Sequence, residues 1–135
     1  MTIRAIQDGD YENILTKWWS DWGFPAPPPK ESIPETSYIA YDGETPVCFC
    51  SLYFTNSSMA WLTWLLSNKE YRKKPHRRYI MNAMIDSVSH FAKQQGCSLV
   101  YTVSNNRFAV EAFEIAGFKK ASSNATELIK TWEQK

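Results

Sequence analysis

The chain has 135 residues, which suits one domain, and 44% of them are hydrophobic while 21% are charged. These proportions are typical of a globular protein, so they exclude a disordered or low-complexity chain. The net charge is +1, from 15 Lys and Arg against 14 Asp and Glu. Because no overall field attracts nucleic acid or an anionic membrane, we expect one domain over residues 1–135 in which any charged site is local.

The cysteines and the N-terminus indicate a cytoplasmic protein with reduced thiols. Cys48, Cys50 and Cys97 are an odd number, and the first ten residues contain no apolar signal segment. The spacing of Cys48 and Cys50 does not match a zinc motif, so we expect no metal and a packing role on one side of a strand. The apolar run near 61–66 is far too short to span a membrane.

The N-terminal half is predicted to form one helix and four strands. The expected elements are a strand over 2–6, a helix from a cap at Asp8 or Asp10 to Gly23, an extended proline-rich stretch over 25–29, and strands over 37–41, 46–54 and 59–67. Trp18, Trp19 and Trp22 recur along the helix at helical spacing, which favours packing against the sheet.

The C-terminal half alternates helices with strands. Residues 79–95 are predicted to form a helix with one apolar stripe, 98–103 a strand, 106–116 a second helix capped by Asn106 and ended by Gly117, and 118–121 and 126–132 two closing strands. The expected order is therefore β-α-β-β-β-α-β-α-β-β. Because a helix joins the strands at 59–67 and 98–103, we expect these two to be parallel in a mixed α/β sheet.

A basic loop precedes the long helix. Six of the ten residues from Lys69 to Arg78 are Lys or Arg. A loop that leads from a strand into a helix presents free backbone N–H groups and a positive dipole, which is a geometry that binds phosphate. The residues alone leave three interpretations open: a solvated basic face, a phosphate or coenzyme A site, and a nucleic-acid contact.

Three motifs resemble the GNAT superfamily of N-acetyltransferases. The stretch Asn106–Phe118 resembles the family's Asn-x-x-Ala-x-x-x-Tyr-x-x-x-Gly-Phe signature, Glu70–Lys74 falls where the family has Tyr-Arg-Gly-Lys-Gly, and Ile3-Arg4 followed by Asp10 is similar to its N-terminus. The resemblance, which extends to small phage-encoded members, implies a GNAT-like mixed sheet flanked by helices. It also implies that the loop binds the pyrophosphate of acetyl-CoA. The residues that the resemblance assigns to the cofactor are Leu65, Leu66, Ser67, Arg72, Lys73, Lys74, Pro75, His76, Arg77, Arg78 and Asn106.

The chain departs from the family pattern at three places. Pro75 and Arg77 stand where the family loop has glycine, and proline has no N–H to donate. Phe113 replaces the tyrosine that in the family often protonates the leaving thiolate. The strand at 59–67 contains no carboxylate to act as a base, and Thr63 occupies the expected inward position. Tyr101 and Ser104 are weak candidates, so the catalytic residue stays unknown.

The resemblance implies an N-acetyltransferase that moves an acetyl group from acetyl-CoA to a primary amine by direct attack. The alternative is a catalytically weak or inactive protein of the same fold that binds a protein partner, with the Trp-rich first helix as its docking surface. Nucleic acid is the weakest of the partner hypotheses because the total charge is near zero. The family often forms homodimers, whereas the acceptor amine and the oligomeric state are not readable from the residues.

Overall fold

The computed structural model describes residues 1–24 and 27–132, and its centre is a five-stranded sheet in the order β1-β2-β3-β4-β5. The strands are β1 (Thr2–Ala5), β2 (Ser37–Asp42), β3 (Thr45–Phe54), β4 (Met59–Ser67) and β5 (Leu99–Tyr101). Neighbouring strands from β1 to β4 are antiparallel, whereas β4 and β5 are parallel. The predicted mixed α/β sheet and the crossover between its last two strands are confirmed.

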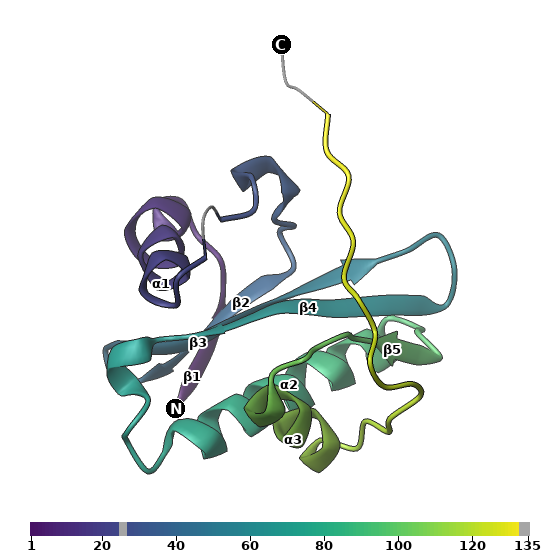
Figure 1. Cartoon of the computed structure of the whole chain (residues 1–135). Coiled ribbons are helices and arrows are strands. Elements are labelled where there is room, and N and C mark those ends of the chain that lie inside the picture. Colours follow the sequence, from purple (N-terminus) through teal and green to yellow (C-terminus); the bar gives the residue numbers. More distant parts are fainter. Residues whose placement is uncertain (25–26, 133–135) are drawn as a thin grey trace.

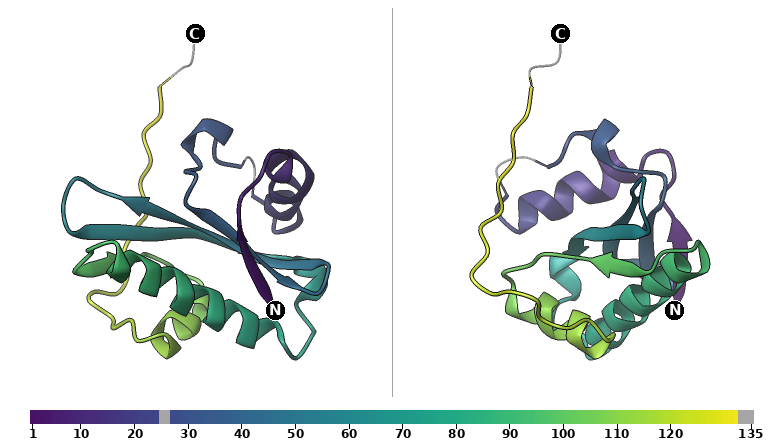
Figure 2. Two further views of the ribbon diagram at one scale, coloured as in Figure 1. Left: turned by 180° about the vertical axis from the view of Figure 1, so that it is seen from behind. Right: turned by 90° about the vertical axis from the view of Figure 1, so that its right-hand side faces the viewer.

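Helices cover both faces of this sheet. The helical elements are the π-helical segment η1 (Tyr11–Leu15), α1 (Thr16–Asp21), the 3₁₀ turns η2 (Lys30–Ser32) and η3 (Lys69–Tyr71), α2 (Arg77–Gln94) and α3 (Arg107–Ile115). α1 lies on one face, and α2 and α3 lie on the other, as Figures 1 and 2 show. Among the helices described, none combines the length and apolar character that a bilayer crossing requires.

The two faces of the sheet carry separate hydrophobic cores. The larger core joins the sheet to α2 and α3, and the smaller one joins it to α1 through Leu15, Trp18 and Trp19. Cys48 and Cys50 are fully buried in the larger core, which confirms their predicted packing role. Burial raises the pKa of the Cys48 thiol to about 12 and also raises that of Cys50, so both thiols are neutral and unreactive at neutral pH.

The first helix differs from its prediction in one respect. Asp10 precedes the helical segment, but its side chain does not cap it. Its carboxylate instead accepts two hydrogen bonds from the Arg4 guanidinium, at 2.7 and 3.1 Å, and one from the Gln7 amide at 2.7 Å. The ion pair therefore joins β1 to the start of the helix. Pro25, in the predicted proline-rich stretch, lies outside the described residues.

The long helix begins close to its predicted start. α2 begins at Arg77, with His76 as the residue before its first turn, which is two residues before the predicted start at position 79. The buried residues Ile80, Met84, Val88 and Ala92 belong to the predicted apolar stripe. This stripe seats α2 on the sheet and leaves its N-terminal turn beside the end of β4.

The two closing strands are not formed. The chain after α3 is described to residue 132 and contains no strand, so the predictions for 118–121 and 126–132 are wrong for this structure. Every residue from 119 to 132 is exposed, and the segment extends away from the sheet as the yellow trace of Figure 1. β5 therefore pairs with β4 alone.

Candidate functional site

β4 and β5 separate after the first three of the nine residues of β4. Their parallel pairing covers Met59 to Trp61 on β4 and Leu99 to Tyr101 on β5, and it stops there, while β4 continues to Ser67. The backbone edge of residues 62–67 on the β5 side thus has no strand partner. Unpaired strand amides and carbonyls are able to hydrogen-bond an extended ligand in the way another strand would.

A β-bulge lies next to this separation. Phe49 of β3 pairs with Leu66 and Ser51 pairs with Thr63, so two residues of β4, Trp64 and Leu65, lie opposite Cys50 alone. Trp64 has a φ of 55°, which is an uncommon conformation for a residue with a Cβ. Because a bulge bends its strand, this one is expected to turn β4 away from β5. The Trp64 indole donates to the Tyr53 hydroxyl at 2.7 Å and packs edge-on against Trp19.

Ser67, at the end of β4, is bonded to helices on both faces of the sheet. The Trp22 indole N–H from the end of α1 donates to its carbonyl at 2.7 Å, and the Arg77 guanidinium from α2 donates to its hydroxyl at 3.0 Å. Asn68 then fixes the turn, because its amide donates to Pro46 and its side-chain oxygen accepts from the Glu70 N–H. These bonds hold the unpaired end of β4 beside the basic loop.

Arg77 is the most unusual residue of the loop. Its Nε is buried and has no hydrogen-bond partner among the described residues, although Nη2 reaches Ser67. Desolvation lowers the pKa of this guanidinium, and the nearby Arg72 and Arg78 lower it further, although it remains charged at neutral pH. A buried cationic donor without a partner is costly, and an anion bound beside it removes that cost.

A cavity of about 170 Å³ lies between the start of α2 and α3, beside Arg77. Its lining includes four cationic side chains and no acidic one. The lining residues are Arg72, Lys74, Pro75, Arg77, Arg78, Met81, Phe108 and Ala112. Ligand sites for drug-sized molecules occupy about 300–1,000 Å³, so this cavity suits a small anionic group or one charged part of a larger ligand.

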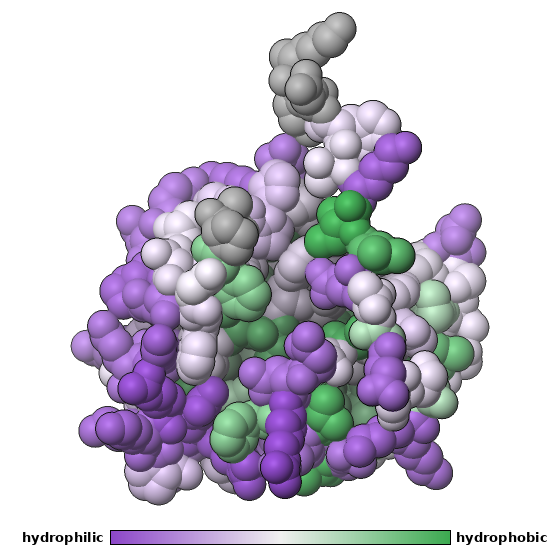
Figure 3. All heavy atoms as spheres, viewed as in Figure 1, coloured by the Kyte–Doolittle hydropathy of each residue, from purple (hydrophilic) through white to green (hydrophobic). Residues whose placement is uncertain are grey.

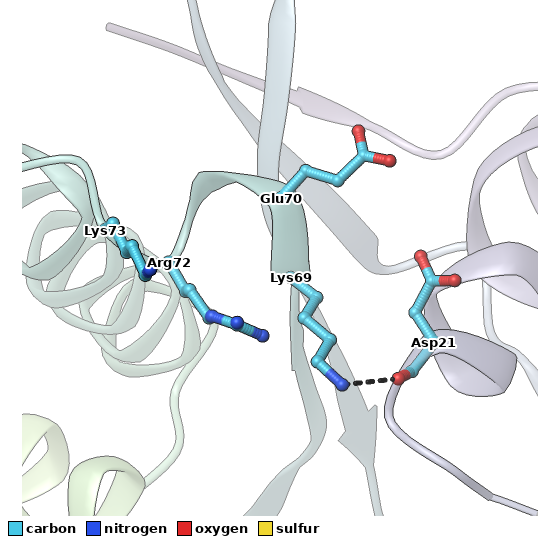
Figure 4. Close-up of a pocket in the computed structure, with 5 residues that line it drawn as sticks. All are labelled: Asp21, Lys69, Glu70, Arg72 and Lys73. Carbon is cyan, nitrogen blue, oxygen red and sulfur yellow. Dashed lines mark hydrogen bonds between the residues drawn. The ribbon is translucent and has the colours of Figure 1, made fainter.

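A second, more open cavity of about 460 Å³ lies on the other side of Arg72 (Figure 4). Its lining is mixed in charge: Lys69, Arg72 and Lys73 face Asp21 and Glu70. Lys69 is already engaged, because its ammonium donates to the Asp21 carbonyl at 3.0 Å and lies over the Trp22 ring. The mixed lining makes this cavity a weaker anion site than the all-cationic one.

Some backbone N–H groups of the loop are already hydrogen-bonded within its own turns. The N–H groups of Lys74 and Arg77 donate to the carbonyls of Tyr71 and Lys74, and Pro75 has none. Arg72, Lys73 and Lys74 are exposed and form no ion pair with any residue that the structure describes. Arg78 is paired with Glu111 of α3 at 3.2 Å. Cationic side chains, more than loop amides, are thus the donors available to an anion here.

α3 carries the family signature, and two of its residues have clear structural roles. The Asn106 side chain accepts from the Ala109 N–H at 3.1 Å, so its predicted helix cap is confirmed. Phe113 is only 4% exposed and packs edge-on against Phe118. A phenyl ring in the core has no proton to donate, so no acid stands at this position.

The structure places the remaining candidates as follows. Thr63 is half-buried on β4 opposite Ser51. Tyr101 lies at the last paired position of β5, with its ring 4.4 Å from that of Trp61. The Ser104 hydroxyl accepts from the Asn106 N–H at 3.1 Å, which is a local turn bond. Among the described residues, no cluster of three metal-ligating side chains occurs.

Sequence reasoning missed two residues of this site. Phe108 was not singled out, although it lines the cationic cavity and is 63% exposed; an exposed aromatic residue in the first turn of a helix was the available signal. The left-handed conformation of Trp64 had no signal, because tryptophan has no preference for that region. Of the residues that the resemblance assigns to the cofactor, Ser67 and Arg77 are hydrogen-bonded, and Arg72, Lys74, Pro75, Arg77 and Arg78 line one cavity.

The sequence matches the family model described as the Acetyltransferase (GNAT) family over residues 4–118. Because the match covers most of the chain, the protein belongs to this family of acetyltransferases. Among curated proteins, none matches the sequence significantly.

Solved structures share the fold at low identity. A transcriptional regulator from Bacillus halodurans C-125 has a TM-score of 0.69 at 17% identity, and the match covers 95% of this chain and 99% of that one. Glucosamine-6-phosphate N-acetyltransferase from Arabidopsis thaliana has a TM-score of 0.63 at 11% identity, covering 96% and 98%. AAC(6')-Iy, solved with the bisubstrate analogue CoA-S-monomethyl-acetylneamine, has a TM-score of 0.60 at 16% identity, covering 99% and 97%. At these identities the likeness shows the GNAT fold alone.

Proposed function

We propose that the protein is an N-acetyltransferase that moves an acetyl group from acetyl-CoA to a primary amine by direct attack. One observation carries the proposal: the edge of β4 that β5 leaves unpaired ends at Ser67, which is hydrogen-bonded to Arg77 of a cavity with four cationic side chains at the start of α2. This arrangement suits an extended polar arm that ends in a diphosphate. The free strand edge can hydrogen-bond the arm, and the cationic side chains can bind the negative charges. The family membership and the CoA analogue bound to AAC(6')-Iy support the same assignment.

The cofactor's diphosphate is assigned to the cationic cavity. Arg72, Lys74, Arg77 and Arg78 line it, and charge-assisted bonds from such groups are about twice as strong as neutral ones. These side chains act as the hydrogen-bond donors to the diphosphate, because Pro75 has no N–H and other loop N–H groups are already bonded within turns. Arg77 lines this cavity and its Nη2 donates to the Ser67 hydroxyl, so its guanidinium is already held at the site. Lys73, His76 and Asn106 remain candidates at the margin of the site.

The pantetheine arm is assigned to the free edge of β4. Leu65, Leu66 and Ser67 are the last residues of that strand, and on its other side Leu66 and Ser67 pair with β3. Leu65 packs against the core under α2 and Leu66 belongs to the core under α1, while the Ser67 hydroxyl is held by Arg77. The strand is thereby anchored, and its amides and carbonyls on the β5 side are positioned before the ligand arrives, which reduces the entropic cost of binding.

Acetyl-CoA supplies an acetyl thioester. In a direct transfer, the unprotonated amine attacks the thioester carbonyl, the C–N bond forms, the C–S bond breaks, and coenzyme A leaves as a thiolate while the amine loses its proton to water. β4 has no carboxylate and Phe113 has no proton, so this chain offers no dedicated acid or base there. The missing general acid–base contribution is about 10²–10⁴-fold in rate, so we expect slow turnover that rests on positioning and on polarisation of the carbonyl.

A second candidate is a weak or inactive member of the fold that binds a protein. The buried Phe113 and the loss of loop glycines favour it. The structure reduces its predicted docking surface, however, because Trp18 and Trp19 are 3% and 4% exposed and belong to the core. Only Trp22 and Phe24 in this segment leave a substantial ring area free, which is small for a protein interface.

Binding and turnover separate the candidates. Calorimetry with acetyl-CoA is expected to give saturable binding, and a thiol assay with a panel of primary amines is expected to detect coenzyme A release that depends on the amine. Binding without release for any amine supports the inactive form of the fold. No heat and no thermal shift at millimolar acetyl-CoA would remove the cofactor assignment and the proposed activity with it.

A further inference from the structure

We propose that the acceptor amine carries an aromatic ring, and that Trp61 of β4 and Tyr101 of β5 bind this ring on the α1 face of the sheet. The inference names a chemical class for the acceptor. It rests on the proposed function, because the two side chains act on an acceptor only if the acetyl group is delivered beside them.

The proposed cofactor site indicates where along β4 the acetyl group lies. The diphosphate is assigned beside Ser67, at the end of β4, and the unpaired edge runs back from there to Leu62. These five residue steps span about 17 Å of extended strand. An arm that begins at Ser67 and follows this edge therefore ends beside the last paired positions, which are Trp61 and Tyr101.

Trp61 and Tyr101 project from the α1 face of the sheet. Their strand neighbours Ala60, Leu62 and Val100 pack in or against the core under α2, and successive side chains of a strand point to opposite faces. The two residues are register partners, and their ring centroids are 4.4 Å apart at an interplanar angle of 60°. Together they form an aromatic surface that bridges the two strands just before these separate.

A third ring extends this surface across the sheet. Tyr53 of β3 is the register partner of Trp61, so Tyr53, Trp61 and Tyr101 form an aromatic row across three strands. The Tyr53 hydroxyl accepts from the Trp64 indole N–H at 2.7 Å and donates to the Ser32 carbonyl at 2.7 Å. Because these bonds hold the ring before a ligand binds, they reduce the entropic cost of binding.

The aromatic row is open to a ligand. Tyr101 is 40% exposed and Trp61 is half-buried. In the part of the chain that the structure describes, the core under α1 extends as far as Trp64 and includes neither of these two residues. Figure 3 shows hydrophobic groups set back in the middle of the face that Figure 1 views, between the α1 side of the molecule and α3. A small molecule therefore reaches the row from solvent.

The composition of the two strands favours an aromatic monoamine over a polyamine. β4 and residues 99–104 contain no Asp or Glu, so a multiply charged amine finds no carboxylate on these strands. Aromatic rings bind another ring by offset or edge-to-face packing, which adds to the effect of area burial. A ring on the aromatic row leaves the amino group free to point into the gap between β4 and β5, where the thioester is expected.

The first measurement is calorimetric binding of 2-phenylethylamine, with and without coenzyme A, compared with hexylamine, which has a similar size and no ring. We expect 2-phenylethylamine to bind about 10-fold more tightly, because ring packing adds to area burial. Trp61→Leu and Tyr101→Leu keep apolar bulk on the strands and should each remove most of this difference, with an unchanged circular dichroism spectrum.

Phe54→Leu is the matched control. Phe54 is 42% exposed on β3, and its ring packs against Phe91 on the α2 face, so its loss removes an equally exposed ring from the opposite face. This variant should keep the preference for 2-phenylethylamine. No measurable binding, equal affinity for the two amines, or a preference that both leucine variants at 61 and 101 retain overturns the proposal.

The second measurement is kcat/KM for the same two amines in the thiol-release assay. We expect a ratio of about 10 in favour of 2-phenylethylamine, which Trp61→Leu should abolish without changing the affinity for acetyl-CoA. Coenzyme A release at equal kcat/KM overturns the aromatic preference and leaves the acetyltransferase assignment intact. Ring-dependent binding without release for any amine overturns the acetyltransferase assignment, while it supports the aromatic row as the binding site.

Discussion

Arg77 has a long side chain at a position where the family has a small residue. A small residue lets the ligand come close to the backbone, whereas Arg77 offers its guanidinium instead. Its guanidinium donates to the Ser67 hydroxyl, and the residue lines the cationic cavity. A charge-assisted bond from a planar guanidinium is directional. The same residue therefore joins the start of α2 to the end of β4, and we propose that it also contacts the bound anion.

Substitution of Arg77 tests this role. Arg77→Ala is expected to weaken acetyl-CoA binding by about 10- to 100-fold, the loss of one or two charged hydrogen bonds. Arg77→Lys keeps the positive charge and is expected to lose less affinity for acetyl-CoA. The measurement is calorimetric affinity, with Lys93→Ala at the far end of α2 as control. If the alanine variant binds as tightly as the wild type, the diphosphate does not contact this side chain.

The Arg4–Asp10 pair is a second residue-scale contact, and it predicts a pH dependence of stability. Burial raises the pKa of Asp10, but the bonds from Arg4 and the Gln7 amide outweigh it, so the pKa lies below its ordinary value. A carboxyl whose pKa is lower in the folded chain stabilises the fold above its unfolded pKa of about 3.9. That contribution is lost as the pH falls through the folded value.

Asp10→Asn is therefore expected to lower the free energy of unfolding by about 1–3 kcal/mol at pH 7. The gap between variant and wild type should close below about pH 4. Urea denaturation at a series of pH values measures both. Asp8→Asn removes an exposed neighbouring carboxylate and should change little. A gap that persists unchanged into acid would show that packing, not the ion pair, is responsible.

At the scale of elements, the features that depend on neighbouring residues were predicted, whereas those that depend on pairing between distant strands were not. The stripe of α2, the end of α3 at Gly117 and the cap at Asn106 all depend on residues within a few positions, and all were predicted. The bulge at Trp64 and the end of the β4–β5 pairing depend on strands that are far apart in the chain. The closing strands were predicted from a valid pattern, but the described chain provides them with no partner.

The hydrogen bond with which the Asn106 side chain caps α3 contributes to the stability of that helix. Asn106→Ala removes the acceptor for the Ala109 N–H and should cost about 1 kcal/mol of stability. Asn105→Ala changes the exposed neighbour and serves as the control. Chemical denaturation of the two variants measures the difference. Equal stability would mean that water replaces the cap without loss.

At the scale of the whole molecule, one sheet supports two cores that lie on opposite faces. Leu15 belongs to the core under α1 and Leu52 to the core under α2, and both are fully buried. The strands are shared, so neither core keeps its sheet when the other is lost. This arrangement predicts that residues 1–118 unfold as one cooperative unit.

Leu15→Ala and Leu52→Ala are expected to lower stability by similar amounts, about 3–5 kcal/mol each. In both variants, tryptophan fluorescence, which reports mainly the α1 side, should change together with circular dichroism in a single transition. Two separated transitions in either variant would contradict the single-unit description and the one-domain expectation for residues 1–135.

The sequence by itself determined the main helices and strands as far as α3, the parallel crossover, the packing of Cys48 and Cys50, and the family, because each depends on local periodicity or on a contiguous motif. Only the tertiary structure decided that Trp22 and Arg77 both bond to Ser67, that β5 leaves the end of β4 unpaired, and that residues 119–132 add no strand to the sheet. These features come from contacts between segments 10 to 45 positions apart. The energies of such contacts depend on how the whole chain packs, and no short stretch of residues encodes that.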